Sequence, residues 1–350
     1  MKITIVGVGA IGGMAGAYMA MAGEDVLFVD RWVDHVKTMN EKGLKISGVR
    51  GDMHVKVKAA TPEQVEGPLE LVIFACKSQH TERAVEGVIH SITPETTVVS
   101  LQNGFNVWRI AKLIPNGTRQ LIGTVPNWTA ALVEPGHLEL VHEGRINIGE
   151  MDGSITERLE HLKSLFSPLT KTYISTNIVG DIWMKQVYFS LVTLSALVDA
   201  PIGEVLKPKR CHWMSVALVR EAMKVPFALG VTLPSEQVTL YNPSTLEETN
   251  RSIKYIEDIS KRWSRQSPKI VKKASGPWWD IVYRKRKSET TGLTGDVVNW
   301  AQKIGVPVPA NAKLCEMIYD IEDHTRELGW DNIDELESFM TSIGEVLPTK

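Results

Sequence analysis

The feature of this sequence that most constrains its fold is a glycine-rich turn close to the N-terminus, Gly7-Val8-Gly9-Ala10-Ile11-Gly12. In a G-x-G-x-x-G turn the first glycine permits a tight bend, the second lets the backbone approach a pyrophosphate, and the third lets helix and strand pack closely. A purely structural glycine turn is the alternative, but the strand-like run before it and the helical stretch after it favour a dinucleotide site. The expected cofactor contacts are Gly7, Gly9, Ala10, Ile11 and Gly12.

The first half of the chain alternates short apolar runs with helical stretches. The strand candidates are Lys2–Val6, Asp25–Val29, Val55–Ala59, Leu71–Cys76, Thr97–Leu101, Leu121–Val125, Leu138–His142 and Ile146–Ile148, with a turn at Pro135-Gly136. The helix candidates are Ala10–Met21, Trp32–Glu41, Thr81–His90 and Val107–Leu113. Strands that are apolar on both faces and alternate with helices indicate a parallel sheet covered on both sides.

The second half changes character after about Ile174. Its segments have helical length or period and show no strand alternation. They are Val179–Leu197, Cys211–Leu229, Thr245–Trp263, Gly295–Ile304 and Ala310–Leu328. The expected fold class is α/β, with an N-terminal Rossmann-type parallel-sheet domain over residues 1–177 and an all-helical C-terminal domain over residues 178–350.

The composition argues against several functional classes. A formal net charge of −2 gives no general attraction to nucleic acid or to anionic membranes. The three cysteines lie far apart and the histidines fit no ligand spacing, so we expect neither a disulfide framework nor a metal site. No cleavable signal segment is visible, and the longest apolar run, residues 182–198, is too short and too polar to span a membrane. We expect a soluble, cytoplasmic protein.

Charge is unevenly distributed in the second half. Residues 261–287 hold ten Lys or Arg and one acid, whereas residues 316–345 hold ten Asp or Glu and one Arg. The simpler interpretation is two solvated faces of opposite charge, packed on each other or on a partner subunit, which leaves a homodimer open. The alternative is that part of the basic segment binds an anionic substrate or the cofactor phosphates.

Two charged residues at the end of the second strand bear on the choice of cofactor. Asp30 lies where an acid would accept hydrogen bonds from the adenosine ribose and repel a 2′-phosphate, which favours NAD. Arg31 follows directly, and its guanidinium could hold a 2′-phosphate if Asp30 turned away, so NADP stays open. Asp30 could also cap the helix that starts at Trp32.

A single lysine interrupts an apolar helix in the second half. Lys185 lies early in the stretch Ile182–Phe189, which is apolar nearly all round and is therefore expected to be buried. A buried ammonium must be paired, deprotonated or in a polar cleft, and a lysine whose pKa is lowered toward neutrality can act as a general acid. The alternative is a lysine whose long side chain reaches solvent.

Several further motifs occur in a definite order along the chain. They are Ala75-Cys76-Lys77, Leu101-Gln102-Asn103-Gly104, Pro135-Gly136 followed by Ile148-Gly149-Glu150, Trp183-x-Lys185, Ser288-Glu289 with Gly295, and Gly305-Val-Pro-Val-Pro-Ala-Asn311. Together with the glycine turn, this set resembles the ketopantoate reductases (2-dehydropantoate 2-reductases). These are NAD(P)H-dependent enzymes with an N-terminal Rossmann domain and a helical C-terminal domain. The resemblance covers nearly the whole chain, and the ordered set is far more specific than any one motif.

The resemblance implies roles for individual residues. Lys185 would donate a proton to the ketone oxygen, with Glu289 as its partner and as a ligand of a substrate hydroxyl. Asn103 would bind substrate beside the nicotinamide and orient Lys185, and Lys77 would line the cleft near the cofactor and the substrate carboxylate. These residue types suit the chemistry, because negative charge develops on the ketone oxygen as hydride arrives. Without the resemblance, Glu289 could equally be a surface carboxylate.

The sequence departs from the family pattern at the substrate pocket. Where the family usually has asparagines four and eight residues after the lysine, this chain has Phe189 and Thr193. The family's serine falls near Gly276, with Ser275 adjacent, and one extra residue precedes Glu289. Phe189, Thr193 and Ser275 are therefore the expected substrate contacts, and the hydride chemistry is better supported than ketopantoate as the substrate.

We expect an NAD(P)H-dependent enzyme that reduces a small 2-oxo acid, ketopantoate or a related acid, in a cleft between the domains. One alternative is a β-hydroxyacid or opine-type dehydrogenase with the same architecture. A second alternative is a non-catalytic dinucleotide sensor whose helical half binds a partner. A sensor would have no need for Lys77, Asn103, Lys185 and Glu289 together.

Overall fold

The computed structural model describes residues 1–265, 270, 272 and 274–345. These residues form two compact units. The first holds Met1–Ile182 together with Ile270 and Lys272, and the second holds the other described residues from Trp183 onward. The division falls inside helix α6 (Ile178–Leu194). The boundary expected at residue 177 lies just before this helix, and it stays a prediction of where two separately folding domains meet.

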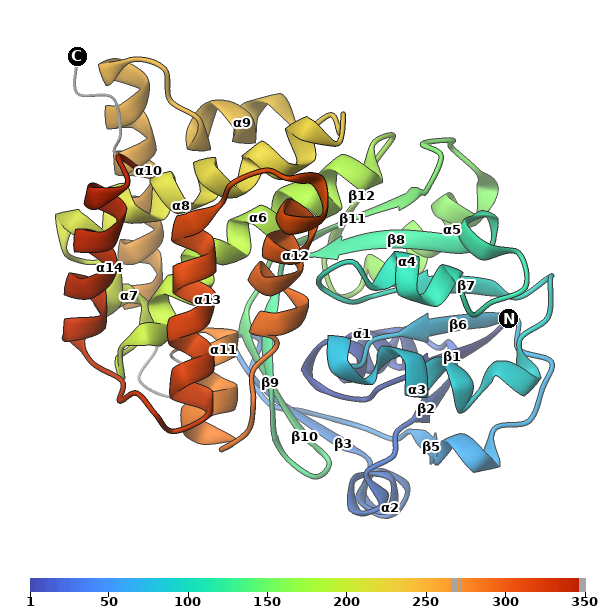
Figure 1. Cartoon of the computed structure of the whole chain (residues 1–350). Coiled ribbons are helices and arrows are strands. Elements are labelled where there is room, and N and C mark those ends of the chain that lie inside the picture. The colour runs from blue at the N-terminus through green and yellow to red at the C-terminus, as the bar shows by residue number, and fades with distance from the viewer. Residues whose placement is uncertain (266–269, 271, 273, 346–350) are drawn as a thin grey trace. The chain divides into compact units, whose positions relative to one another are not determined.

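The first unit is built on a large sheet whose strands, in the described residues, have the order β12-β11-β8-β7-β6-β1-β2-β5 (Figure 1). The strands are β1 (Lys2–Val6), β2 (Asp25–Val29), β5 (Lys58–Ala60), β6 (Leu71–Phe74), β7 (Thr97–Ser100), β8 (Leu121–Pro126), β11 (Arg145–Glu150) and β12 (Lys171–Ile174). Every neighbouring pair is parallel except β8 with β11. Strand β6 is buried on both faces, as expected for a sheet covered by helices. The predicted Rossmann-type parallel sheet is confirmed.

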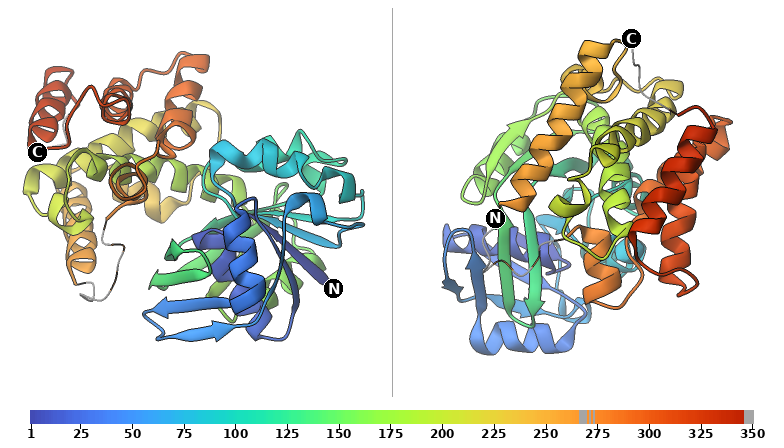
Figure 2. Two further views of the ribbon diagram at one scale, coloured as in Figure 1. Left: turned by 90° about the horizontal axis from the view of Figure 1, so that it is seen from below. Right: turned by 90° about the vertical axis from the view of Figure 1, so that its left-hand side faces the viewer.

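The same unit contains a smaller sheet, of which the sequence analysis predicted only the strand at residues 138–142. Its order is β4-β3-β10-β9, with strands β3 (Leu44–Gly48), β4 (Met53–Val55), β9 (Thr129–Glu134) and β10 (His137–His142). Helix α1 (Ala10–Met21) contacts β1 and β2 as well as β9 and β10, so it lies between the two sheets (Figure 2). The single strand predicted at residues 55–59 is wrong, because the chain leaves the small sheet at Val55 and enters the large one at Lys58.

Helices connect the strands of the first unit. They are α1, α2 (Val33–Lys42), α3 (Thr81–Glu86), α4 (Asn106–Ala111) and α5 (Glu157–Phe166), with short 3-10 turns at Pro62–Gln64, Ser78–His80, Ile89–Ser91 and Gly117–Arg119. The prediction for α1 is confirmed to the residue, and the helix predicted over 81–90 ends early, at Glu86. Helix α5 was not predicted, although Leu159, Leu162 and Leu165 repeat at helical spacing and are buried.

The described residues of the second unit form helices and turns only, which confirms the predicted helical second half. The helices are α6, α7 (Ile202–Val205), α8 (Lys209–Ala228), α9 (Ser235–Tyr241), α10 (Leu246–Ser264), α11 (Gly276–Trp278), α12 (Thr294–Ile304), α13 (Pro309–Glu322) and α14 (Trp330–Ser342). Helix α10 packs along α7, α8 and α9, and α13 packs against α8, α12 and α14 (Figures 1 and 2). Helices α9 and α14 lie in segments without a predicted element.

Many acidic residues of segment 316–345 form ion pairs with cations of helix α8. Others pair with Lys313 and Arg326. The pairs are Arg210 with Asp334 and Glu337, Lys313 and Arg326 with Glu335, and Arg220 and Lys224 with Glu345. From the described part of the basic segment, Lys287 pairs with Asp323. Among the described residues, the acidic segment therefore pairs mainly with cations outside the basic segment.

Candidate active site

The three glycines of the N-terminal turn differ in what surrounds them. Gly7 has a φ of +96°, and a Cβ there would lie 2.5 Å from the Cys76 backbone nitrogen. A Cβ at Gly12 would collide with the Gly7 carbonyl oxygen. A Cβ at Gly9, in contrast, would meet no protein atom within 4 Å. The protein's own packing therefore requires Gly7 and Gly12, whereas Gly9 faces open space at the start of α1.

The open space at Gly9 suits a pyrophosphate. Gly9 is the N-cap of α1, and it has no side chain to accept hydrogen bonds from the first N–H groups of the helix. The first turn of α1 also carries no acidic residue. Unpaired N–H groups and the positive end of the helix dipole favour phosphate oxygens at this position. The residues present thus fit a dinucleotide, which the N–H groups of Ala10 and Ile11 would hold by its pyrophosphate.

The Asp30 carboxylate is anchored to the glycine turn. Its Oδ2 accepts a hydrogen bond from the Val8 N–H at 2.7 Å, and its Oδ1 accepts one from the Trp32 N–H at 2.9 Å. Each oxygen keeps a second lone pair that could accept a bond from a ribose hydroxyl. The helix-capping alternative for Asp30 is wrong, because α2 begins at Val33 with Trp32 as its N-cap and has no side-chain cap. Arg31 is exposed.

Lys77 lies in the loop after β6, and a buried glutamine holds this loop in place. Gln102, which follows β7, donates from Nε2 to the Cys76 carbonyl oxygen at 2.8 Å and to the Thr81 hydroxyl at 2.8 Å. These bonds fix the chain before and after Lys77. The loop follows the carboxyl end of a parallel strand, and this edge is where open α/β sheets bind ligands.

Asn103 lies at the same edge and has a buried oxygen without a partner. Its backbone carbonyl accepts a hydrogen bond from Asn106 Nδ2 at 2.6 Å, and Asn106 also donates to the Ser78 hydroxyl at 2.9 Å. Asn103 Oδ1, however, is buried and has no hydrogen-bond partner among the described residues. A buried acceptor left unsatisfied costs about 1–3 kcal/mol, so this atom favours a ligand that brings a donor.

In the second unit, Lys185 lies half-buried on α6. Burial lowers the pKa of Lys185 to about 7, and the Glu289 carboxylate opposes this shift. At neutral pH the amine is therefore present in both its protonated and its neutral form, which suits a group that exchanges a proton during a reaction. The lowered pKa also explains how an amine is tolerated on an apolar helix.

A glutamine next to Lys185 ties α6 to the segment that carries Glu289. Gln186 is buried, and its Nε2 donates to the Leu293 carbonyl oxygen at 2.6 Å and to the Gly292 carbonyl oxygen at 3.2 Å. Residues 289–293 are thus held against the helix turn that contains Lys185. The hydrogen bonds of Gln186 therefore bring the segment that carries Glu289 close to Lys185.

A second pair of hydrogen bonds holds the residue that precedes Glu289. Glu322, at the end of α13, accepts hydrogen bonds through Oε1 from the N–H and the O–H of Ser288, at 2.8 Å and 2.6 Å. Burial raises the pKa of Glu322, and the bonds from Ser288 oppose that shift. The residue directly before Glu289 is therefore fixed to α13.

The three expected substrate contacts on this unit differ in what their side chains do. Phe189 is 9% exposed and lies one helical turn beyond Lys185, on the same face of α6. Thr193 is fully buried, and its hydroxyl bonds to the Thr294 hydroxyl at 2.8 Å. Ser275 is the N-cap of α11 and accepts a bond from the Trp278 N–H at 3.4 Å. The two hydroxyls thus have structural partners, and all three substrate roles stay predictions.

The predicted site residues therefore fall into two groups. The first unit holds Gly7, Gly9, Ala10, Ile11, Gly12, Asp30, Arg31, Lys77 and Asn103, and the second holds Lys185, Phe189, Thr193, Ser275 and Glu289. The sequence analysis missed the polar side chains whose hydrogen bonds hold the chain next to these residues, namely Gln102, Asn106, Gln186 and Glu322. A polar residue directly after Lys185 on an apolar helix was a usable signal for Gln186.

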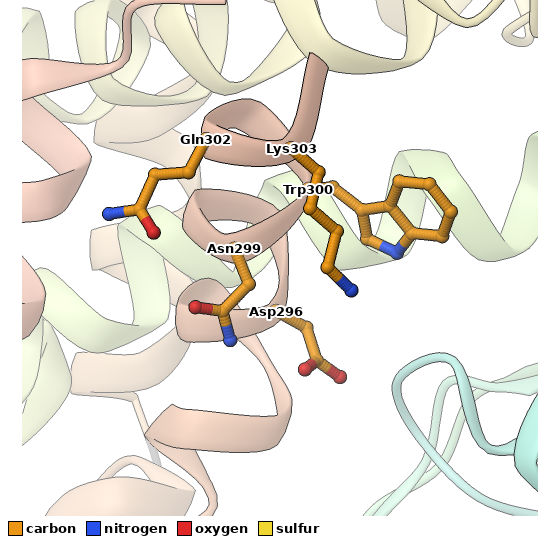
Figure 3. A pocket seen from close by; sticks show the side chains of 5 residues that line it. All are labelled: Asp296, Asn299, Trp300, Gln302 and Lys303. Carbon is orange, nitrogen blue, oxygen red and sulfur yellow. The ribbon is translucent and has the colours of Figure 1, made fainter. Parts of the chain in front are cut away.

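One hollow on the second unit is lined by other residues. A shallow hollow of about 520 Å³ on α12 is lined by Asp296, Asn299, Trp300, Gln302 and Lys303, none of them a predicted site residue (Figure 3). Among the described residues, no group of three or more His, Cys, Asp or Glu could hold a metal ion. Within the same residues, no helix has the length and apolar character needed to cross a bilayer.

Comparison with known proteins gives matches over most of the chain. Residues 3–153 match the family model Ketopantoate reductase PanE/ApbA, and residues 177–322 match Ketopantoate reductase PanE/ApbA C terminal. The chain belongs to the ketopantoate reductase family. The 2-dehydropantoate 2-reductase of Pyrococcus abyssi is 30% identical to it, over 91% of this chain and 97% of that protein. The family inferred from the order of the motifs is confirmed, and with it an oxidoreductase that acts on CH–OH groups.

Solved structures agree with this assignment of the fold. A PanE/ApbA family ketopantoate reductase from Ralstonia eutropha JMP134 is 26% identical, with a TM-score of 0.76 over 93% of this chain and 100% of that one. A D-mandelate dehydrogenase, solved with NADH and anilino(oxo)acetate, is 23% identical, with a TM-score of 0.78 over 93% of this chain and 99% of that one. Membership of the ketopantoate reductase family does not favour the opine-type or the sensor alternative.

Proposed function

We propose that this member of the ketopantoate reductase family reduces a small 2-oxo acid, ketopantoate or a related acid, to the 2-hydroxy acid with NAD(P)H, and that Lys185 is the general acid. A bound reduced nicotinamide would supply hydride to the 2-oxo carbon. The observation that carries the proposal is a half-buried amine on the apolar helix α6, whose neighbour Gln186 bonds to the segment that follows Glu289. Burial lowers the pKa of this amine to about 7, and the Glu289 carboxylate opposes the shift. In its protonated form this amine can stabilise the negative charge on the ketone oxygen and give it a proton.

The first unit would bind the cofactor and one end of the substrate. The glycine turn would hold the pyrophosphate, and Asp30 would accept bonds from the adenosine ribose, which favours NAD. Arg31 is exposed next to Asp30 and keeps NADP possible as the second cofactor. Lys77 would attract the substrate carboxylate, and Asn103 would use its unsatisfied Oδ1 to accept a bond from a donor on the substrate or the nicotinamide.

The second unit would complete the substrate site. Glu289 would keep the Lys185 amine protonated over a wider pH range and accept a bond from a substrate hydroxyl. Phe189, Thr193 and Ser275 are the proposed pocket residues, and the aromatic ring in place of an amide favours an apolar substituent on the acid. A homodimer, the exclusion of nucleic acid and of membranes, and a cytoplasmic location stay predictions.

A substrate screen tests the proposed function. The protein is mixed with NADH or NADPH and a panel of 2-oxo acids that differ in the size and polarity of the substituent, and loss of the nicotinamide absorbance is followed. We expect turnover of at least one acid. Tight cofactor binding without turnover of any acid would contradict the proposal.

Replacing Asp30 with alanine is expected to raise the ratio of kcat/KM with NADPH to kcat/KM with NADH by about tenfold, because the carboxylate that repels a 2′-phosphate is lost. The loss of the Val8 hydrogen bond weakens both cofactors alike and cancels in the ratio. Arg31→Ala is the matched control and should move the ratio the other way. An unchanged ratio in Asp30→Ala would refute the cofactor assignment.

The pH dependence of reduction follows from Lys185. The proton donor is present below its pKa of about 7 in the ligand-free protein, so kcat/KM for reduction should fall as pH rises through that value. In Glu289→Gln the charge that raises the pKa of Lys185 is gone, so the midpoint should move to lower pH by about one unit. Glu327→Gln, at an exposed position, serves as control. The same midpoint in Glu289→Gln and wild type would show that Glu289 does not act on the amine.

Replacing Phe189 with asparagine tests whether this ring excludes ketopantoate. The amide would offer polar groups one turn from Lys185, so kcat/KM for ketopantoate should rise about tenfold relative to an acid with an apolar substituent. The unfolding midpoint is measured in parallel, since a buried ring is removed. A variant that folds but shows no relative gain would mean that other residues shape the pocket.

A further inference from the structure

A buried histidine joins the glycine turn to the tip of the β9–β10 hairpin. His35, on α2, is fully buried. Its Nδ1 accepts a hydrogen bond from the Gly136 N–H at 2.9 Å, and its Nε2 lies 2.9 Å from the Val8 carbonyl oxygen. Because a carbonyl oxygen only accepts, Nε2 carries the proton and the ring is the neutral Nε2–H tautomer. One ring nitrogen thus accepts a hydrogen bond and the other donates one.

The bond to Val8 fixes the peptide group that leads into Gly9. The Val8 carbonyl and the Gly9 N–H belong to one planar trans peptide, in which the two groups point in opposite directions. Holding the carbonyl toward His35 therefore directs the Gly9 N–H away from it. The Val8 N–H is held in turn by Asp30 Oδ2 at 2.7 Å. Two side chains thus set the orientation of the backbone at the one glycine of the turn that faces open space.

On its other side, the histidine contacts a hairpin tip that is packed tightly on α2. Gly136 has a φ of +76°, and a Cβ there would lie 2.5 Å from Thr38 Cγ2. Its carbonyl oxygen accepts a bond from the Lys45 N–H at 2.8 Å, which ties the tip to β3. Figure 1 shows the β9–β10 hairpin extending to α2. The ring is therefore anchored to a tip that is itself hydrogen-bonded to β3.

We propose that His35 is a positioning residue for the dinucleotide, whose neutral ring orients the Val8–Gly9 peptide toward the pyrophosphate. The inference rests on the proposed cofactor site. Protonation at Nδ1 would set an N–H against the Gly136 N–H, and two donors cannot bond to each other. The ring would then lose its anchor, so cofactor affinity should fall when His35 takes up a proton.

The direction of the pH dependence follows from the surroundings of the ring. Burial lowers the pKa of His35 from 6.5, while the bond to Val8 and the Asp30 carboxylate oppose this shift. The hairpin tip adds the pair Glu134 and His137, at 3.6 Å. The neutral ring therefore predominates at neutral pH, and we expect weaker cofactor binding only as the pH falls below about 6.5.

Two substitutions separate the two hydrogen bonds of His35. In His35→Asn the amide oxygen can take the position of Nδ1 and keep the bond to Gly136, but no donor reaches Val8. In His35→Gln the longer side chain can donate to Val8, but the acceptor for Gly136 is lost. His90→Asn is the matched control, because His90 is exposed and bonds to the Val65 carbonyl oxygen at 3.2 Å.

The test measures the Kd for NADH by calorimetry, between about pH 5 and about pH 7.5, together with the unfolding midpoint of the cofactor-free protein. At neutral pH we expect His35→Asn to weaken binding about tenfold, His35→Gln to weaken it less, and His90→Asn to leave it unchanged. The increase in Kd at acid pH should be smaller in both His35 variants than in wild type. Protonation of Asp30 would raise Kd equally in all three proteins and would not cause such a difference.

Two outcomes would overturn the inference, and they differ from a failure of the proposed function. Wild-type affinity in a folded His35→Asn variant, or the same acid dependence in wild type and both variants, would show that the ring does not act on the cofactor site. If wild type binds neither NADH nor NADPH, the proposed function itself is wrong, and the inference falls with it.

Discussion

Replacing Lys185 with methionine is expected to lower kcat/KM for reduction of the preferred 2-oxo acid by about a thousandfold, because the reaction loses its proton donor. Methionine keeps the apolar part of the side chain, so α6 should pack as before. Removal of a partly buried amine whose pKa is lowered to about 7 should not destabilise the fold. The measurement is steady-state reduction at saturating cofactor, with the Kd for NADH determined separately.

The control for this prediction is Lys207→Met, since Lys207 is exposed in the same unit and pairs with Glu204 at 3.7 Å. That variant should behave as wild type. We expect Lys185→Met to bind NADH with unchanged affinity, because the cofactor contacts lie on the first unit. A loss of less than about tenfold in kcat/KM would exclude Lys185 as the general acid.

Replacing Gly9 with valine should weaken binding of both NADH and NADPH by at least about a hundredfold without unfolding the protein. A Cβ at this position meets no protein atom within 4 Å, and the backbone of Gly9, with φ −78°, suits an L-residue, so we expect the fold to accept a side chain here. It would occupy the space in which a pyrophosphate approaches the first N–H groups of α1. The Kd for each cofactor and the unfolding midpoint are measured on the same preparation.

Gly7→Ala provides the opposite control. Its Cβ would lie 2.5 Å from the Cys76 nitrogen at a φ of +96°, so we expect a lower unfolding midpoint even without cofactor. If Gly9→Val binds NADH as wild type does, the turn is structural only, and the proposed cofactor site is wrong.

Much of the fold could be predicted because its signals are local. The run at residues 2–6, the glycine turn and helix α1 follow each other directly, and each supports the assignment of the next. The small sheet could not be predicted in this way. Strand β10 was predicted, but β3 pairs with it over a long distance in the chain, Lys45 with His137, and β3 and β4 mix buried with exposed positions. Short half-exposed strands carry a weak periodic signal.

The candidate site was only partly accessible from the sequence. Lys185 stands out because a charge is unusual within an apolar helix. Asp30 stands out because it follows the second strand, where an acid can bind the adenosine ribose. The contacts of the buried polar residues near them could not be predicted, because the partners are distant in the chain. His35 and Gly136 are 101 residues apart, and Gln186 reaches Leu293 over 107 residues. Such contacts depend on tertiary structure, and a polar residue at helical spacing gives no sign of its distant partner.

The most direct test of the central claim is a titration of the Lys185 amine itself. Lysine labelled with ¹⁵N at Nζ is followed by NMR as a function of pH, and the Lys185→Met variant assigns the signal. We expect a midpoint near 7 in the ligand-free protein, in agreement with the pH at which kcat/KM for reduction falls by half. A midpoint near the ordinary value of 10.5, with reduction still falling near neutrality, would mean that another group donates the proton.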